Sequence, residues 1–215
     1  MICAAMQAAY GAHDLPCPPR ERILSIVGLS LTEAFARLGG GEGRVPLARL
    51  VESYKAAFHG LRQSPDHLEP LFPGARRALD ALSARDDILL GIATGKSQRG
   101  VRAVLDHHDL LARFHTIKTA DDAPSKPHPG MVRAAMEEAG VGPHDTIVVG
   151  DTVYDIAMAR AAGTRAIGVA WGYHAAGDLH AEGADLVIDD FAALVPALDS
   201  LWQAGPQPRV GHVAD

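Results

Sequence analysis

The feature that most constrains this chain is a regular alternation, from about residue 70 onward, of short apolar runs and amphipathic segments. The apolar runs have the length of strands and occupy residues 87–93, 114–118, 146–149, 165–170 and 186–188. Apolar residues with helical spacing mark the intervening and flanking segments, at 75–82, 101–105, 132–139, 156–162 and 191–202. Strands that alternate with helices in this way form βαβ units with parallel strands. The sequence therefore predicts an α/β fold with a doubly wound, Rossmann-like parallel sheet.

The first 70 residues predict a small all-helical module instead. Apolar stripes with helical spacing run along residues 2–9 and 47–54, and Ser30-Leu31-Thr32-Glu33 matches a capping box before another helix. We expect a helical module at 1–70, an α/β core at 71–204 and a disordered tail at 205–215.

Composition and charge exclude several classes of protein. The 20 basic and 26 acidic residues give a formal net charge of −6, which argues against non-specific binding of nucleic acid. Uninterrupted apolar stretches reach about six residues, whereas a membrane-spanning helix needs about 20. Cys3 and Cys17 form neither a disulfide framework nor a zinc motif. With no positively charged leader, these features predict a cytoplasmic protein without membrane or nucleic-acid partners.

Polar residues follow the first three predicted strands, where ligands bind in open parallel sheets. Thr94 and Gly95 follow the first strand, Lys126 lies in the loop after the second, and Asp151 and Asp155 follow the third. Because the carboxyl ends of parallel strands meet at one edge of the sheet, we expect these residues to form one site.

Each residue type in this set suits the binding of a phosphate together with Mg²⁺. Asp151 and Asp155 lie one helical turn apart, and Mg²⁺ prefers carboxylates, water and substrate phosphate as ligands. The hydroxyl of Thr94 and the backbone N–H of Gly95 can donate to phosphate oxygens. Lys126 supplies a positive charge opposite a dianion.

Each of these residues also has a purely structural interpretation. Thr94-Gly95 is a common pair at the end of a strand, Asp155 could cap the following helix, and Lys126 could be a surface lysine before a proline turn. Their ordered recurrence at successive strand ends favours the functional interpretation.

The histidines show no metal-binding pattern. His107 and His108 are adjacent and would point in different directions on a helix, while His174 and His180 are expected in a loop without ligand spacing.

The order and spacing of the polar residues resemble motifs two, three and four of the haloacid dehalogenase-like hydrolases. The matching segments are Thr94, Lys126-Pro127 and Gly150-Asp151-x-x-x-Asp155. The segments Phe72-Pro73-Gly74, Lys126-Pro127-His128-Pro129 and Ala161-Ala162-Gly163 resemble the phosphoglycolate phosphatase-like branch, whose helical cap domain is similar to residues 11–70.

This resemblance implies Mg²⁺-dependent hydrolysis of a small phosphorylated metabolite through an aspartyl-phosphate, and 2-phosphoglycolate is the substrate it favours. Thr94 and Lys126 would be catalytic, and together with Gly95 they would bind the phosphoryl group. Asp151 and Asp155 would bind Mg²⁺, and the cap would exclude water. Residues 28–30 are interpreted mainly as a helix connection that could reach the site. The oligomeric state stays open.

The first motif of the family, Asp-x-Asp-Gly-Thr, has no match in these 215 residues. In the family its first aspartate is the nucleophile, its second is the general acid and base, and its strand lies in the middle of the sheet. Asp14 follows no strand and is not a substitute. We therefore expect a gap between the strands at 87–93 and 146–149, little turnover, and a Met1 that is an internal methionine or the start of a fragment.

Two alternatives belong to other functional classes. One is a non-catalytic relative that binds phosphate esters or regulates. The other is a signalling receiver domain, which also places aspartates, a threonine and a lysine around Mg²⁺. In a receiver domain the acidic pair precedes the lysine, whereas here it follows Lys126, and a cap has no place there.

Overall fold

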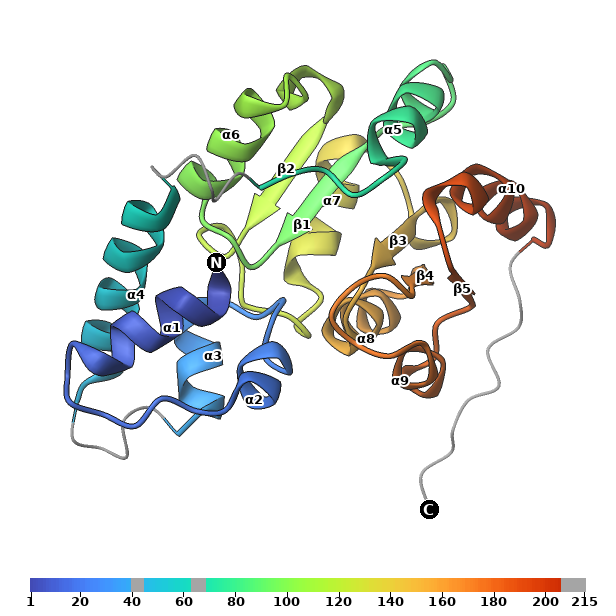
Figure 1. Ribbon diagram of the computed structural model, residues 1–215. Coiled ribbons are helices and arrows are strands. Elements are labelled where there is room, and N and C mark those ends of the chain that lie inside the picture. The colour runs from blue at the N-terminus through green and yellow to red at the C-terminus, as the bar shows by residue number, and fades with distance from the viewer. Residues whose placement is uncertain (40–44, 63–68, 206–215) are drawn as a thin grey trace.

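Figure 1 shows the computed structural model of the chain, which describes residues 1–39, 45–62 and 69–205. The helices are α1 (Ile2–Gly11), α2 (Arg20–Leu24), α3 (Leu31–Arg37), α4 (Leu47–Arg62), α5 (Ala75–Ser83), α6 (Gln98–His107), α7 (Gly130–Ala139), α8 (Val153–Ala162), α9 (Ala176–Glu182) and α10 (Leu194–Gln203). The strands are β1 (Gly91–Thr94), β2 (Thr116–Thr119), β3 (Ile147–Gly150), β4 (Arg165–Val169) and β5 (Leu186–Ile188). Short 3₁₀ helices occur at Leu111–Arg113, Pro143–Asp145 and Phe191–Ala193. The predicted tail at 205–215 lies outside the described residues except for Gly205.

The strands pair in parallel, which confirms the predicted α/β fold, but they form two sheets. One sheet has the order β1-β2 and the other the order β3-β4-β5. Over the residues that the structure describes, no hydrogen-bonded ladder joins β1 to β3. This separation agrees with the gap expected between these two strands.

Helices rather than backbone hydrogen bonds hold the two sheets together. Ala93 of β1 and Val148 of β3 both pack against one apolar cluster, whose buried members are Met131, Val132, Met136, Met158 and Ala162 of α7 and α8. Val149 of β3 remains 40% exposed, and the residues of β1 are exposed or only partly buried. The edges of β1 and β3 are therefore less covered than strands in the middle of a sheet would be.

The first strand differs from its prediction. Residues 88–90 are not in a strand, and β1 begins at Gly91, whose partner in the register is Thr116. The residues of β1 are at most partly buried, and among the described residues β1 has a partner along one edge alone. The segment that contains His180, expected to be a loop, forms α9.

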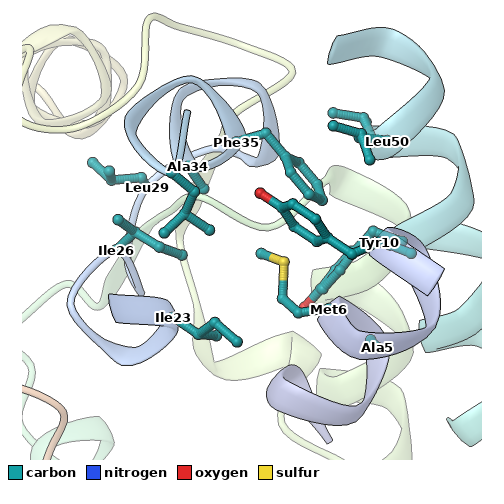
Figure 2. Packing of buried hydrophobic residues seen from close by; sticks show 13 residues of the cluster. Ala5, Met6, Tyr10, Ile23, Ile26, Leu29, Ala34, Phe35 and Leu50 are labelled. Atoms are coloured by element: carbon teal, nitrogen blue, oxygen red, sulfur yellow. The ribbon is translucent and has the colours of Figure 1, made fainter. Parts of the chain in front are cut away.

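Helices α1 to α4 form the helical module, and Figure 1 shows it off the carboxyl ends of β1 and β2. Its buried cluster includes Met6, Tyr10, Phe35 and Leu50 (Figure 2). Helix α1 is thus packed into the helical module. The boundary at residue 70 stays a prediction. No helix in the described part of the chain is long and apolar enough to cross a membrane.

The capping box predicted at Ser30 forms only in part. The Ser30 hydroxyl accepts a hydrogen bond from the backbone N–H of Glu33 at 3.4 Å, as a helix N-cap does. The Glu33 carboxylate pairs with Arg37 at 3.0 Å. An N-cap therefore begins α3 as predicted, while the reciprocal contact is replaced by an i,i+4 ion pair.

Candidate functional site

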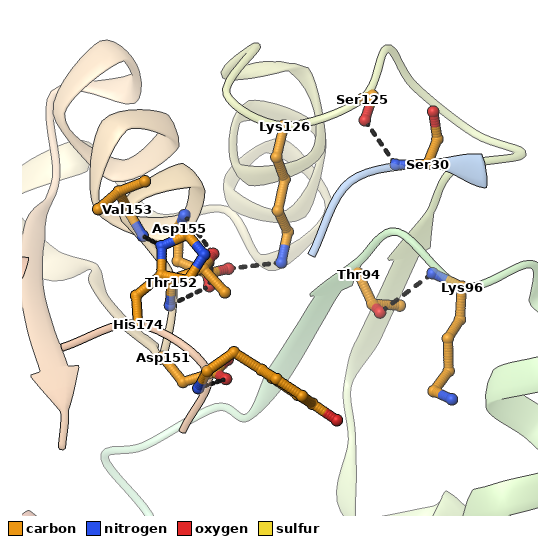
Figure 3. A network of polar contacts seen from close by, with 11 residues as sticks. Ser30, Thr94, Lys96, Ser125, Lys126, Asp151, Thr152, Val153, Asp155 and His174 are labelled. Carbon is orange, nitrogen blue, oxygen red and sulfur yellow. Dashed lines mark hydrogen bonds and ion pairs between the residues drawn. The ribbon is translucent and has the colours of Figure 1, made fainter. Parts of the chain in front are cut away.

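The structure brings the predicted site residues to one edge of the two sheets. Thr94 ends β1, Lys126 lies in the loop between β2 and α7, Asp151 follows β3, and Asp155 lies in the first turn of α8. Figure 3 shows the side chains of Thr94, Lys126, Asp151 and Asp155 around a common region between these strand ends.

Lys126 and Asp155 form a buried ion pair. The Lys126 Nζ atom lies 2.5 Å from Asp155 Oδ1, and the two residues are only 7% and 5% exposed. The interpretation of Lys126 as a surface lysine is therefore wrong, because its long side chain runs inward from the loop (Figure 3). A buried charge of this kind requires a partner of opposite sign.

Asp155 also belongs to a capping box that the sequence analysis did not identify. Asp155 Oδ2 accepts hydrogen bonds from the backbone N–H of Thr152 at 3.1 Å and from its hydroxyl at 2.7 Å. The Thr152 hydroxyl oxygen in turn accepts from the backbone N–H of Asp155 at 3.3 Å. Thr152, and not Asp155 as expected in the structural interpretation, is therefore the N-cap of α8, and Asp155 completes the capping box from the third helical position. The Thr-x-x-Asp spacing before the helix was the available signal.

Asp151 is half-buried and has less compensation for its charge. Its Oδ2 accepts from the backbone N–H of Tyr173 at 3.0 Å. Burial and then the negative charge of Asp155 raise the pKa of Asp151, while the Tyr173 N–H and Lys126 oppose this. Asp151 and Asp155 share the single ammonium group of Lys126. A further cation beside Asp151 would therefore offset both the cost of burying its charge and its repulsion by Asp155.

These residues fit a Mg²⁺ ion that is only partly coordinated by protein. Within the described ranges, no three His, Cys, Asp or Glu side chains come together as a metal site. Mg²⁺ commonly binds through one or two carboxylates, several waters and a substrate phosphate. Asp151 suits a direct contact, whereas both carboxylate oxygens of Asp155 already have protein partners.

Thr94 and Gly95 have structural roles in addition to any role in binding. The Thr94 hydroxyl accepts from the backbone N–H of Lys96 at 3.2 Å and so closes the turn after β1. A Cβ atom on Gly95 would lie 2.5 Å from the carbonyl oxygen of Leu29. Glycine is therefore required here by the close approach of the helical module.

Residues 28–30, which connect α2 to α3, contact all three loops of the site. Besides the approach to Gly95, a Cβ on Gly28 would lie 3.0 Å from Thr152 Oγ1. The backbone N–H of Ser30 donates to Ser125 Oγ at 2.8 Å (Figure 3). A hollow of about 470 Å³ opens beside this contact, lined by Glu33 and residues 124–128. The segment is both a helix connection and a part of the site.

The loop after β4 is a part of the site that the sequence analysis missed. Tyr173 contacts Asp151 through its backbone, and His174 contacts the start of α8. Both residues lie about twenty positions after Asp151, so no local spacing pattern could place them there.

The comparisons with known proteins agree with this geometry. The sequence profile of a family described as "Haloacid dehalogenase-like hydrolase" matches residues 1–169. A probable phosphatase, IndB, of Dickeya dadantii is 34% identical over 213 residues, which cover 96% of this chain and 90% of that protein. A phosphoglycolate phosphatase of Pseudomonas putida is 33% identical over 148 residues, covering 68% of this chain and 54% of that protein.

Solved structures with this fold are similar as well. A hydrolase from Pseudomonas syringae superposes with a TM-score of 0.79 at 26% identity, covering 92% of this chain and 90% of that one. A β-phosphoglucomutase from Clostridium difficile, with a TM-score of 0.76 at 19% identity, covers 94% of this chain and 88% of that one and shares the fold. The resemblance found in the sequence is confirmed.

Proposed function

Because this chain belongs to the haloacid dehalogenase-like hydrolases, we propose that its site hydrolyses small phosphate monoesters with Mg²⁺ held at Asp151. The observation that carries this proposal is the convergence of Thr94, the buried Lys126–Asp155 pair and Asp151 at the carboxyl ends of parallel strands. Hydroxyl, ammonium and carboxylate groups at one sheet edge are what a phosphate dianion and a hard cation need.

Each residue has a distinct role in this proposal. The Thr94 hydroxyl and the Gly95 N–H bind phosphoryl oxygens, and Lys126 stabilises their negative charge while Asp155 fixes its ammonium group. Asp151 binds Mg²⁺, and Asp155 contributes to the metal site through water. Bound Mg²⁺ would polarise the phosphoryl group and offset the charge that builds up during transfer.

The substrate we propose is 2-phosphoglycolate. Support comes from relatives that are named phosphoglycolate phosphatases, such as the Pseudomonas putida protein. The contact of Ser30 with Ser125 and the hollow beside it support a role of the helical module in contacting the leaving group. A cytoplasmic location stays a prediction.

The nucleophile is the part of the mechanism that these 215 residues do not supply, since they contain no Asp-x-Asp-Gly-Thr segment. We propose that in the active protein a strand carrying this segment lies between β1 and β3. Within the described residues, β1 pairs only with β2 and β3 only with β4, each in parallel, and Val149 of β3 is exposed. Without such a strand, the chain should turn over little substrate.

Metal binding tests the proposed site directly. Isothermal titration with Mg²⁺ should give saturable binding to the 215-residue chain, and Asp151→Asn should weaken it at least tenfold because a direct carboxylate ligand is lost. Asp178→Asn, at an exposed aspartate in the first turn of α9, is the matched control and should bind like the unchanged chain. Equal affinities of the two variants would refute the assignment of Asp151.

A second candidate function follows from the absent nucleophile: a protein that binds phosphate esters without turnover. Titration of 2-phosphoglycolate with phosphate release measured in parallel separates the two. Tight binding with no release by the protein from its native source would favour the binding protein. Mg²⁺-dependent release by the 215-residue chain itself would overturn the inferred need for another strand.

A further inference from the structure

We propose that His174 is a positioning residue that fixes Asp151 through the loop between β4 and α9. Because Asp151 is the Mg²⁺ ligand in the proposed function, the effect of His174 on metal binding rests on that proposal. The contacts on which it depends exist in the protein without metal, so they can be tested separately.

Three hydrogen bonds connect this loop to the turn between β3 and α8. His174 Nδ1 accepts from the backbone N–H of Val153 at 3.2 Å (Figure 3). The backbone N–H of His174 donates to the carbonyl oxygen of Asp151 at 3.2 Å. The backbone N–H of Tyr173 donates to Asp151 Oδ2 at 3.0 Å. The loop thus holds Asp151 at its main chain, at its carboxylate and at the residue two positions later.

Close packing leaves Asp151 little freedom within these contacts. A Cβ atom on Gly172 would lie 2.0 Å from Asp151 Cβ and 2.5 Å from its Oδ2. Glycine is therefore needed at 172, because any side chain there would displace the aspartate. Asp151 therefore packs and bonds closely against the loop at Gly172, Tyr173 and His174.

The ring of His174 is fixed in orientation and in tautomer. Because Nδ1 accepts a hydrogen bond, the neutral ring carries its proton on Nε2. The ring makes an edge-to-face contact with the ring of Tyr154, with the centroids 5.5 Å apart and the planes at 67°. Nε2 is buried and has no hydrogen-bond partner among the described residues. A buried donor without a partner calls for an explanation. Here the hydrogen bond that Nδ1 accepts from Val153 fixes the ring and so leaves Nε2 in this position.

The test compares two side chains that replace different nitrogens of the ring. In His174→Asn, the amide oxygen can take the place of Nδ1 and accept from Val153, whereas in His174→Gln it reaches the place of Nε2. We expect His174→Gln to weaken Mg²⁺ binding about 10- to 100-fold, as removal of a residue that orients a metal ligand does. His174→Asn should keep most of the affinity. His13→Ala removes a half-buried histidine bonded to Ser53 in the helical module and should leave the affinity unchanged.

Amide hydrogen exchange without metal provides a second readout. The amides of Val153 and Tyr173 should exchange at least tenfold faster in His174→Gln than in His174→Asn, with far-ultraviolet circular dichroism confirming that both variants are folded. Equal exchange and equal Mg²⁺ affinity in the two variants would overturn the proposal. If the unchanged chain bound no Mg²⁺, the assignment of Asp151 as its ligand would fail, and the exchange rates alone would decide whether His174 positions it.

Discussion

At the scale of residues, the described part of the site holds two carboxylates and only one ammonium group. Asp151 and Asp155 share the ammonium group of Lys126, which bonds directly to Asp155. Asp155 is also satisfied by Thr152, so the uncompensated charge falls on Asp151, whose pKa is raised by burial and by Asp155. A carboxylate with this balance of charges is a candidate for binding a cation.

Asp151→Asn should therefore raise the thermal stability of the metal-free protein at pH 7. Since the pKa of Asp151 is higher in the folded than in the unfolded state, the folded state binds more protons in the window just above the ordinary pKa, and stability falls as the pH rises through it. Asparagine removes the charge and can still accept from the Tyr173 N–H. The measurement is the melting temperature at pH 7 with and without Mg²⁺.

Mg²⁺ should raise the melting temperature of the unchanged chain and leave that of Asp151→Asn unaltered. Asp178→Asn again serves as the control and should behave like the unchanged chain. A lower melting temperature for metal-free Asp151→Asn would contradict the charge balance described above.

At the scale of elements, the N-terminus of α8 connects local structure to the site. Its capping box satisfies backbone donors of the first helical turn and at the same time orients Asp155 toward Lys126. At the same end of the helix, the backbone N–H of Val153 donates to His174 Nδ1. Helix formation and the geometry of the site therefore depend on the same few residues.

Thr152→Ala should destabilise the protein by about 1 kcal/mol, the usual effect of removing an N-cap, and should also weaken Mg²⁺ binding because Asp155 loses the hydroxyl that orients it. Ser97→Ala removes the N-cap of α6, where the serine hydroxyl accepts from Gly100 at 3.2 Å. We expect a similar loss of stability there with unchanged Mg²⁺ affinity. Urea unfolding and calorimetric titration measure the two effects.

Elements with strong local signals could be predicted from the sequence. The last strand was predicted at its observed bounds. Gly140 and Gly163 follow the ends of α7 and α8 and adopt the left-handed conformation, which is a common local signal for the end of a helix. Contacts between distant segments could not be predicted. The approach of His174 to α8 and of Leu29 to Gly95 depends on how whole elements pack.

At the scale of the whole molecule, two partial sheets pack against the same helices, α7 and α8, and the helical module lies off the carboxyl ends of β1 and β2 (Figure 1). Tyr154 of α8 ties the module to the core, since its hydroxyl donates to the Ser25 carbonyl at 2.9 Å and Arg37 lies 5.0 Å from its ring centroid. The residues that we propose for phosphate and metal lie at the ends of β1 and β3 and in the loop after β2, and the nucleophile that we propose would enter between β1 and β3.

The most direct test of this account is phosphate release from 2-phosphoglycolate in Mg²⁺, measured for the 215-residue chain and for the protein purified from its native source, with the intact mass of the latter determined. We predict Mg²⁺-dependent release by the protein from its native source and little or no release by the 215-residue chain. Equal Mg²⁺-dependent release by both, or a native protein of 22.7 kDa that is fully active, would contradict the central claim that catalysis needs a further strand at this site.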